Sequence, residues 1–483
     1  MKMDISLDPK LKEDQFSAWY DPRSWRHLTD QATVESWLGR SMICPACGRQ
    51  HTITTRAITA ASPLADCAAD LIQALGFDGR ALIVMDRRTE AAAGAALAEQ
   101  LSRFHPAAFV FAEEHLHADE NALGQLMMGL ANRPDFLISC GSGTVTDITR
   151  YLSYVSEIPF IAVATAASVD GYASATTPLL HHGFKRTFPG VAPQAIFYDP
   201  QVLAQAPPAM TAAGFADVLA KVVALLDWRL AWHLEDEPYC PLIAGLVDRA
   251  VADCLSLAGD LAWRPDQVDS QTMDRRAKAC DQLMSALSLT GIAMQMMGTS
   301  RPASGADHQI SHLLEMRDVK NGRAASLHGD KVGLGTLISL SMYQSLFEER
   351  SLPAQHPILP AARWAQEVRR VYGQQAATAL AINEPEPPQG ALWEAQKIRL
   401  DAAMNAFGYE VISSFAGLLP RAEALITAMG GPTRASQLGY TRQDLYDAVA
   451  FGKENRPKLT VLRLAERFGR LYDLAQDAAD HWI

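Results

Sequence analysis

Three residues in the second half of the chain, Asp217, His308 and His328, are candidates for metal chemistry. They occur in the segments GFADVLAK, GADHQISHLLE and SLHGDKVGLG, which have the alanine and leucine content of helices. One carboxylate and two imidazoles can bind a divalent cation and leave a coordination position open for a substrate oxygen. Taken singly, each residue could instead be a helix cap, a surface residue or a hydrogen-bonded core residue. Their shared context, downstream of a nucleotide-binding pattern, favours one catalytic metal site.

A second group of possible ligands occurs near the N-terminus. Cys44 and Cys47 form a CPAC pair, and His51 follows closely. This spacing could be half of a zinc site, but no second cysteine pair follows, and Cys67 lies in a helix-like segment that makes it no obvious fourth ligand. The alternative is a simple hairpin turn in CPACGRQHTITTRAI. The sequence leaves any role of these three residues open.

Composition limits the classes of function. A chain of 483 residues with 48% hydrophobic residues can bury more than one core, so two domains are expected. The net charge of −11 and the lack of a dense basic stripe argue against a nucleic-acid partner. Seven scattered cysteines suit reduced thiols in a reducing compartment. The N-terminus carries charges where a signal peptide needs an apolar run, and we see no apolar stretch suited to cross a bilayer, so a cytoplasmic protein without a membrane partner is expected.

From residue 78 onward, strand-like and helix-like segments alternate. The apolar runs are ALIVMD, AAFVFA, DFLISC, PFIAVATAA and AIFYD, and the segments between the first four are helical in pattern. This alternation predicts an α/β domain with a parallel, doubly wound sheet and with ligands at the carboxyl ends of its strands.

The third run leads directly into GSGTVTDITRYLSY, where Gly141 and Gly143 permit a tight turn before a helix. Backbone N–H groups at such a helix start can hold a pyrophosphate. The pattern differs from GxGxxG because Thr146 replaces the third glycine. Asp86 ends the first run, where an acid can accept hydrogen bonds from a ribose and favour NAD, although Arg87 and its neighbour could bind the extra phosphate of NADP.

The fourth run opens into SVDGYASATTPLL, a segment of small residues that a nicotinamide and a substrate could approach closely. The hydroxyls of Thr165, Ser168 and Ser174 could bind amide or ribose groups. Asp170 could accept a hydrogen bond from a substrate hydroxyl.

Helical patterns dominate from Thr211 nearly to the C-terminus, with breaks expected at Asn383–Gly390 and Met429–Thr433. We therefore expect an N-terminal extension and a Rossmann-like NAD(P)-binding domain in residues 1–207, followed by an all-α helical-bundle domain in residues 208–483 that binds metal and substrate.

The order of the motifs GSGTVTDITR, SVDGYAS, GFADVLAK with LLDW, SRPASGADHQISH and HGDKVGLG resembles the sn-glycerol-1-phosphate dehydrogenases. These form a branch of the iron-type alcohol dehydrogenase, glycerol dehydrogenase and dehydroquinate synthase superfamily. The resemblance runs from about residue 50 to residue 475. It implies a cleft between two domains that holds NAD(P), a divalent metal and a small phosphorylated substrate, and it implies a homodimer.

The resemblance also implies roles for single residues. The metal ligands of the family match Asp217, His308 and His328, and His312 matches a histidine that contacts substrate or transfers a proton. Zn²⁺ is the expected metal, but Ni²⁺ and Fe²⁺ accept the same donors.

On the cofactor side, the turn of the family matches Gly141–Thr144, Asp147 matches an acid near the nicotinamide, and Asp170 matches an acid that contacts a substrate hydroxyl. Ser142 and Thr144 stand where glycerol dehydrogenases have the middle glycine and the lysine of GGGK, as in the phosphate-substrate branch.

A phosphorylated substrate needs cations, and the sequence offers Lys221, Arg301 and, third, Lys185 as phosphate ligands. Each could instead be an ordinary salt-bridged or solvated base. The expected reaction is the interconversion of dihydroxyacetone phosphate and sn-glycerol 1-phosphate. Two alternatives are a polyol dehydrogenase that acts on an unphosphorylated substrate such as glycerol, and a lyase similar to dehydroquinate synthase, a class that has Glu at the position of Asp217.

Overall fold

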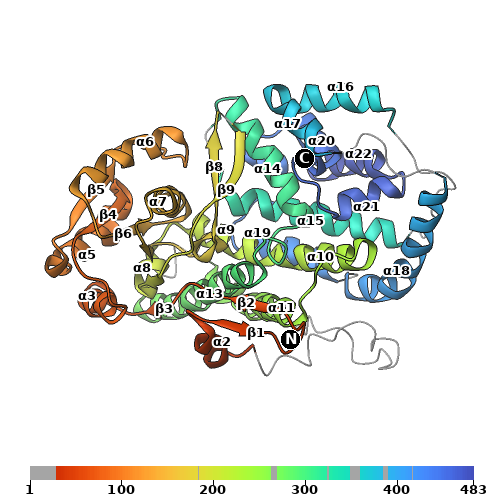
Figure 1. The fold of residues 1–483 in the computed structure, drawn as a ribbon. Coiled ribbons are helices and arrows are strands. Elements are labelled where there is room, and N and C mark those ends of the chain that lie inside the picture. The colour runs from red at the N-terminus through yellow and green to blue at the C-terminus, as the bar shows by residue number, and fades with distance from the viewer. Residues whose placement is uncertain are drawn as a thin grey trace.

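The computed structural model describes residues 29–182, 184–262, 269–323, 326–348, 359–383, 390–415 and 417–483. Figure 1 shows two parts side by side: a sheet with flanking helices, and a larger assembly of helices. The charged N-terminal segment, which argued against a signal peptide, lies outside the described residues. Most of the predicted helix break at Asn383–Gly390 also lies outside them.

The sheet has six strands in the order β3-β10-β7-β6-β4-β5, and all neighbouring pairs are parallel. The strands are β3 (Ala57–Ala60), β4 (Ala81–Asp86), β5 (Ala107–Phe111), β6 (Phe136–Gly141), β7 (Phe160–Ala164) and β10 (Ala195–Tyr198). Strands β6 and β7 are buried along their whole length because helices cover both faces of the sheet. Five of these strands match the five apolar runs of the sequence, and the doubly wound α/β prediction is confirmed.

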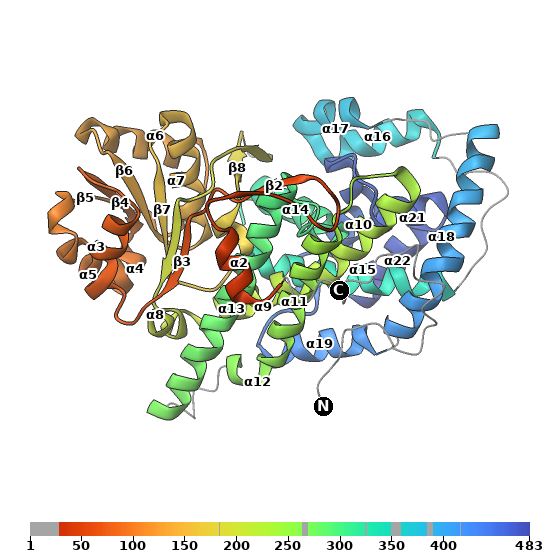
Figure 2. The same ribbon diagram turned by 60° about the horizontal axis from the view of Figure 1, so that its bottom comes forward.

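Helices pack on both faces of this sheet. Figure 2 shows α3 and α5 on one side, with α6 and α7 on the other. Ile83 and Met85 of β4 pack on the α3 and α5 side, whereas Leu82 and Val84 pack on the opposite side, as the alternation of a strand requires. The helices are α3 (Ala65–Ala74), α4 (Arg87–Thr89), α5 (Ala95–Gln100), α6 (Glu120–Gly129), α7 (Gly143–Ser156) and α8 (Pro200–Gln205).

The strand order reverses between β4 and β6. The chain leaves β4 toward β5 on one side and leaves β6 toward β7 on the other, so a crevice opens at the carboxyl ends of β4 and β6. Asp86 and Gly141 are the last residues of these two strands. Ligands of doubly wound sheets bind at this kind of position.

Two antiparallel hairpins form small sheets that are separate from the six-stranded sheet. The segment after β7 forms an antiparallel hairpin of β8 (Thr176–His181) and β9 (Phe184–Pro189), which the sequence analysis did not anticipate. A second hairpin, β1 (Ser41–Ile43) and β2 (Gln50–Thr52), follows α2 (Gln31–Trp37) and lies beside α13 and α11 of the helical part (Figure 1).

Helices dominate from Pro208 onward, in agreement with the predicted helical domain. The longer ones are α9 (Pro208–Leu219), α10 (Lys221–Glu235), α11 (Pro241–Ser256), α13 (Ser270–Met297), α14 (Ala306–Lys320), α15 (His328–Glu348), α16 (Ala361–Tyr372), α18 (Ala391–Phe415), α19 (Leu418–Ala428), α20 (Arg442–Phe451) and α22 (Leu471–His481), with shorter α12 (Ala258–Leu261), α17 (Ala376–Ile382) and α21 (Val461–Arg467). The predicted break at Met429–Thr433 is confirmed by the end of α19 at Ala428. The division at residues 207 and 208 stays a prediction.

One stretch of the described residues, Pro208–Glu235, is long and apolar enough to cross a membrane, with a mean hydropathy of 1.7. It comprises α9 and α10, and 72% of its most apolar window is buried inside the protein. It also carries buried charges at Asp217, Lys221 and Asp227. This stretch is therefore packed as a pair of core helices.

A glycine allows the close contact between α9 and α15. A Cβ atom at Gly329 would lie 2.0 Å from the carbonyl oxygen of Ala213 on α9, which no side chain could tolerate. The first turn of α15 therefore touches α9 directly. This contact brings His328, at the start of α15, near Asp217 on α9.

Candidate active site

Asp217, His308 and His328 converge in the structure. They come from α9, α14 and α15, and one ligand atom of each lies within 4.8 Å of the others. The Nε2 atom of His308 is 3.9 Å from Oδ1 of Asp217, and the two histidine rings are 5.3 Å apart between centroids. Asp217 and His308 are buried, while the side chain of His328 is about a quarter exposed. The cluster therefore has buried donors and one accessible side.

Two acidic residues orient the histidines. The Nδ1 atom of His308 contacts the carboxylate of Asp307, and Nδ1 of His328 lies 2.9 Å from Oε1 of Glu315. When Nδ1–H donates to a carboxylate, the lone pair of Nε2 is left to bind a metal. The donor set and its supports thus fit a divalent cation. Neither support was predicted from the sequence, although Asp307 directly precedes His308 and Glu315 ends the segment GADHQISHLLE.

Asp217 takes part in a buried charge network. Its Oδ2 accepts a hydrogen bond from the backbone N–H of Asp170 at 2.9 Å, and its Oδ1 accepts one from Nζ of Lys221 at 2.6 Å. The same ammonium lies 2.9 Å from Oδ2 of Asp170. Burial alone would lower the pKa of Lys221, but the carboxylates of Asp170 and Asp217 raise it above its ordinary value. Lys221 therefore stays charged and balances the two carboxylates.

This geometry corrects the expectation that Lys221 binds the substrate phosphate. The side chain is fully buried, and its ammonium is engaged by two carboxylates. Its spacing of four residues from Asp217 does place both on one helical face, but the consequence is an ion pair with that carboxylate.

Asp170 and His312 lie next to the three candidate ligands. Asp170 begins the short helix η5 (Asp170–Ala173), and burial raises its pKa to about 6, with the charge of Asp217 acting in the same direction. His312 lies one turn after His308 on α14, with its ring centroid 6.0 Å from that of His308 and 6.2 Å from that of His328. Both predicted substrate contacts are thus brought to the cluster.

The glycine-rich turn lies at the carboxyl edge of the sheet, as predicted. Gly141 ends β6, Ser142 occupies the N-cap position of α7 without a side-chain capping bond, and a Cβ at Gly141 would lie 2.7 Å from Cβ of Val145. Only glycine therefore permits this tight passage from strand to helix. Thr144 lies in the first turn of α7, where free backbone N–H groups are available to a pyrophosphate. The turn fits the phosphates of a dinucleotide.

Other predicted cofactor residues are near this turn. The backbone N–H of Thr165 donates to the carbonyl of Gly141 at 3.2 Å, so the end of β7 adjoins the turn. Ser168 is buried three residues further on. Asp147, on α7, contacts the guanidinium of Arg150, which also donates to the carbonyl of Tyr172 at 3.1 Å.

Two further predicted cofactor residues have local hydrogen bonds. Asp86 caps α4 by accepting from the N–H groups of Arg88 at 2.9 Å and Thr89 at 2.8 Å. The hydroxyl of Ser174 donates to the carbonyl of Thr176 and accepts from its N–H, both at 3.0 Å. Asp86 still lies at the crevice between β4 and β6, whereas Ser174 stabilises the start of β8.

Comparison with known proteins identifies the family. A glycerol-1-phosphate dehydrogenase (NAD(P)+) of Geobacillus thermodenitrificans is 35% identical over 368 residues, which cover 74% of this chain and 80% of that relative. The enzyme of the same name from Methanothrix thermoacetophila is 32% identical over 346 residues, covering 71% of this chain and 88% of the relative. The chain belongs to the glycerol-1-phosphate dehydrogenase family.

Two broader comparisons agree with this membership. Residues 61–207 match the family model described as iron-containing alcohol dehydrogenase. A solved structure of glycerol dehydrogenase from Schizosaccharomyces pombe, 15% identical, covers 88% of this chain and 91% of its own with a TM-score of 0.55. A 1,3-propanediol oxidoreductase, 16% identical, covers 88% and 98% with a TM-score of 0.56. These two structures show that the chain shares their fold.

Three basic residues of this family member gather beside the cluster. Nζ of Lys458 lies 3.0 Å from Oγ of Ser300, and Nη1 of Arg456 lies 3.4 Å from the same oxygen. Burial lowers the pKa of Lys458 to about 7, and the charges of Arg456 and Arg301 act in the same direction. The charge of Arg456 also lowers the pKa of His308, after burial and the charges of Lys221 and His328. Arg456 is therefore within electrostatic reach of His308, and Lys458 shares the contact of Arg456 with Ser300.

Arg301 differs from the other two cations because it already has a carboxylate partner. Its Nε and Nη2 atoms donate to the two oxygens of Glu237 at 2.9 Å and 2.5 Å, and its side chain is buried. The expectation that Arg301 binds the substrate phosphate stays a prediction: Glu237 engages its Nε and Nη2 atoms, while its buried Nη1 has no hydrogen-bond partner among the described residues. The side chain of Lys185 is not among those described.

Arg456 and Lys458 were missed as site residues because they lie 128 and 130 residues after His328 in the segment GKENRPKLT. The neighbouring Asn455 donates to the carbonyl of Gln309 at 3.1 Å, which fixes this segment beside His308 on α14. Its cluster of bases in a family motif was the signal that could have found them.

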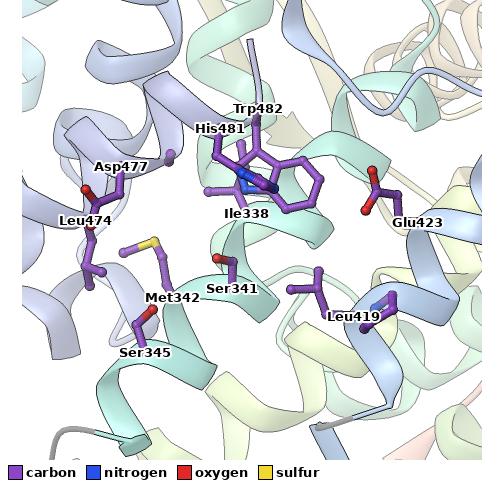
Figure 3. A pocket seen from close by; sticks show the side chains of 12 residues that line it. Ile338, Ser341, Met342, Ser345, Leu419, Glu423, Leu474, Asp477, His481 and Trp482 are labelled. Carbon is purple, nitrogen blue, oxygen red and sulfur yellow. The ribbon is translucent and has the colours of Figure 1, made fainter.

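A surface pocket of about 350 Å³ lies elsewhere in the helical part (Figure 3). It is lined by α15, α19 and α22, with Ile338 and Met342 on one wall and Trp482 on another. Ile338 is ten residues after His328, or about 15 Å along the helix. The pocket is therefore separate from the candidate active site.

Proposed function

We propose that this chain is a metal-dependent, NAD(P)-linked dehydrogenase that interconverts dihydroxyacetone phosphate and sn-glycerol 1-phosphate. The observation that carries this proposal is the convergence of Asp217, His308 and His328, with Arg456 in electrostatic reach of His308, in a member of the glycerol-1-phosphate dehydrogenase family. Lys458 contacts the same serine as Arg456. A donor set that leaves one side accessible suits a substrate oxygen, and two cations suit its phosphate.

The divalent cation held by Asp217, His308 and His328 supplies Lewis-acid chemistry to a ketone or alkoxide oxygen when it is bound. Asp307 and Glu315 keep the two imidazoles in the orientation that presents Nε2. Lys221 compensates the negative charge of Asp217 in the low-dielectric interior. We propose Zn²⁺ because two imidazoles, one carboxylate and an open position are typical of catalytic zinc.

The chain's other residues bind and orient the reactants. Backbone N–H groups of Gly141–Thr144 bind the pyrophosphate of the dinucleotide, and Thr165 and Ser168 line the adjoining strand end. A bound NAD(P) would supply the hydride chemistry at the substrate carbon. Asp170 positions a substrate hydroxyl, and an imidazole nitrogen of His312 delivers or accepts the proton that accompanies hydride transfer.

Specificity for the phosphate ester comes from Arg456 and Lys458. Each charged hydrogen bond to a phosphate contributes about 1.5–3 kcal/mol, so the pair favours dihydroxyacetone phosphate over dihydroxyacetone by about 100-fold or more. Glu237 holds Arg301 in place through Nε and Nη2, which leaves Nη1 of Arg301 without a partner among the described residues.

The test is NADH or NADPH oxidation with each of the two ketones. We expect rapid turnover of the phosphate ester and poor turnover of dihydroxyacetone, with Lys458→Met raising KM only for the ester. Lys320→Met, an exposed lysine at the end of α14, is the matched control and leaves both rates unchanged. Equal rates on both ketones would favour a polyol dehydrogenase, and the absence of net cofactor oxidation would favour the lyase.

We also propose that the enzyme is a cytoplasmic homodimer. Met127 and Met128 on α6 and Tyr154 and Val155 on the neighbouring α7 are exposed apolar side chains, and an apolar patch of this kind suits a subunit contact. Light scattering at micromolar concentration should return twice the chain mass of 52.6 kDa. A stable monomer would contradict this assembly.

A further inference from the structure

A second cluster of metal-ligand side chains lies outside the candidate active site. Cys44, Cys47, His51 and Cys240 each place one ligand atom within 4.8 Å of the other three. Cys44 and His51 come from the β1–β2 hairpin, and Cys240 immediately precedes α11, so residues 196 positions apart meet here. Cys240 is the fourth ligand that the sequence alone did not reveal.

The distances within this cluster match tetrahedral zinc. The Sγ atoms of Cys44 and Cys240 are 3.7 Å apart, and Sγ of Cys47 lies 3.3 Å from Nε2 of His51. Zn–S bonds of about 2.3 Å at tetrahedral angles separate two sulfurs by about 3.8 Å, and a sulfur from a histidine nitrogen by about 3.5 Å. A disulfide requires about 2.05 Å between the sulfurs, so Cys44 and Cys240 are not bonded to each other.

The histidine is held in the orientation that a ligand needs. Nδ1 of His51 lies 2.7 Å from the backbone carbonyl oxygen of Met296, at the end of α13. A carbonyl can only accept a hydrogen bond, so Nδ1 carries the proton and the lone pair of Nε2 points toward Cys47. A buried histidine with both nitrogens so arranged is prepared for a metal.

The local backbone brings the cysteines together. The N–H of Cys44 donates to the carbonyl of Arg49 at 2.8 Å, and the N–H of Gly48 donates back to Cys44 at 2.9 Å. Gly48 has a φ of +70°, which glycine adopts without strain and which turns the chain directly after Cys47. The guanidinium of Arg49 then donates to the carbonyl of Tyr239 at 2.7 Å, which draws Cys240 onto the hairpin.

We propose that Cys44, Cys47, His51 and Cys240 bind a structural Zn²⁺ ion. Three thiolates and one imidazole complete a tetrahedral shell, so no coordination position remains for a substrate or water. Cys44, His51 and Cys240 are buried, which excludes solvent from the ion. The ligand set is soft and thiolate-rich, unlike the Asp/His/His set of the candidate active site.

The ion would join the two parts of the molecule. It fixes the hairpin on α11 and α13 of the helical part, and the chain then continues into β3 at the edge of the sheet. Between the hairpin and β3, the side chain of Gln295 accepts from the N–H of Thr54 at 3.0 Å and donates to Thr55 at 2.9 Å. The zinc site thus anchors the segment that crosses from the helices to the sheet.

Zinc analysis of the full-length protein tests the proposal. We expect about two zinc ions per chain in the wild type, one in His328→Ala and one in Cys240→Ser. Cys67→Ser, a half-buried cysteine on α3 outside the cluster, keeps both ions. Cys240→Ser should also lower Tm by about 5–10 °C, because an ion that binds only the folded state stabilises it.

A second readout does not depend on the folding of the Cys240→Ser protein. X-ray absorption of zinc in His328→Ala should show about three sulfur neighbours at ~2.3 Å and one nitrogen. The proposal is overturned if His328→Ala holds no zinc or if its zinc has no sulfur neighbours. It is also overturned if the denatured, unreduced wild type shows five free thiols in place of seven, because two cysteines would then form a disulfide.

Discussion

The two metal-ligand clusters of this molecule differ in the number and the kind of donors that they bring together. The Asp/His/His cluster offers three hard or intermediate donors and an accessible side, whereas the Cys/Cys/His/Cys cluster offers four donors and no free position. The first is suited to bind a substrate oxygen and the second to hold two chain segments together. Both clusters are largely buried, so burial does not distinguish them. The number of converging donors does distinguish a site suited to catalysis from a site suited to a structural ion.

The supports of the histidines differ in the same way. Nδ1 of His308 contacts the carboxylate of Asp307, and Nδ1 of His328 contacts that of Glu315. Such carboxylate partners make an imidazole a stronger metal ligand. His51 leans on a neutral main-chain carbonyl of Met296. The Asp/His/His cluster can therefore be tuned by side-chain substitution, whereas the support of the Cys/Cys/His/Cys cluster is part of the backbone.

The largest expected effect separates the two clusters by activity. His328→Ala should lower kcat/KM for dihydroxyacetone phosphate by about 1,000-fold or more, because several kcal/mol of Lewis-acid stabilisation is lost with the metal. Cys44→Ser, measured well below its Tm, should keep kcat within about twofold, since the cluster contacts no reactant. Steady-state kinetics with metal analysis checks both. A Cys44→Ser enzyme as inactive as His328→Ala would contradict the proposal that only the Asp/His/His cluster takes part in catalysis.

His312→Ala tests which histidines of the Asp/His/His cluster bind the metal. Its ring lies beside the ligands but outside the set of three, so we expect unchanged metal content and a fall in kcat of about 100-fold from lost proton transfer. Metal analysis beside the kinetics decides the role. Loss of the metal on this substitution would mean that His312 is a ligand and that one of the other histidines is not.

Chelation should discriminate between an open and a closed shell. A small chelator can take the open position first, so it should remove one metal ion and abolish activity while Tm changes by only a few degrees. The second ion should leave only on denaturation or on thiol modification. Simultaneous loss of both ions, or full activity after one ion is removed, would contradict the proposal of one open catalytic shell and one closed structural shell.

A smaller effect is expected from the carboxylate supports. Glu315→Gln keeps the size of the side chain but weakens the acceptor for His328, so affinity for the catalytic metal should fall by about 10–100-fold. Competition with a chelator of known affinity measures this change. Added metal should restore kcat, which a misfolded variant could not show. An unchanged metal affinity would indicate that Glu315 does not position His328.

The smallest effect concerns pH and the phosphate. The pKa of Lys458 is lowered to about 7, so its positive charge is present below this pH and is lost as the pH rises through it. KM for dihydroxyacetone phosphate should therefore rise by about five- to tenfold between pH 7 and pH 9. Lys458→Arg keeps its charge and should flatten the profile. A wild-type KM that stays constant over this range would exclude Lys458 as a phosphate ligand.

The sequence predicted the elements whose residues repeat a simple pattern. Fully buried parallel strands need continuous apolar runs, and these made five strands and the glycine-rich turn visible. The β8–β9 hairpin was not found because its strands, TTPLLH and FKRTFP, mix polar and apolar residues and contain no continuous apolar run. The three candidate metal ligands, each in a segment that resembles a family motif, do converge in the structure.

Contacts between distant segments could not be predicted from the sequence. Cys240 lies 189 residues after His51 without a spacing pattern, so only the packing of the hairpin on α11 reveals it as a ligand. The spacing of Lys221 from Asp217 predicted one shared helical face, but burial decided that the lysine pairs with carboxylates. The ion pair of Arg301 with Glu237, which lies in a separate loop, was likewise not predictable from the sequence.

The most direct test of the proposed activity is the handedness of its product. Dihydroxyacetone phosphate should be reduced with NADH or NADPH to completion, and the glycerol phosphate formed should then be offered to an enzyme specific for sn-glycerol 3-phosphate. We predict that the product is sn-glycerol 1-phosphate and is left unoxidised. A product that this second enzyme consumes fully would contradict the proposed function.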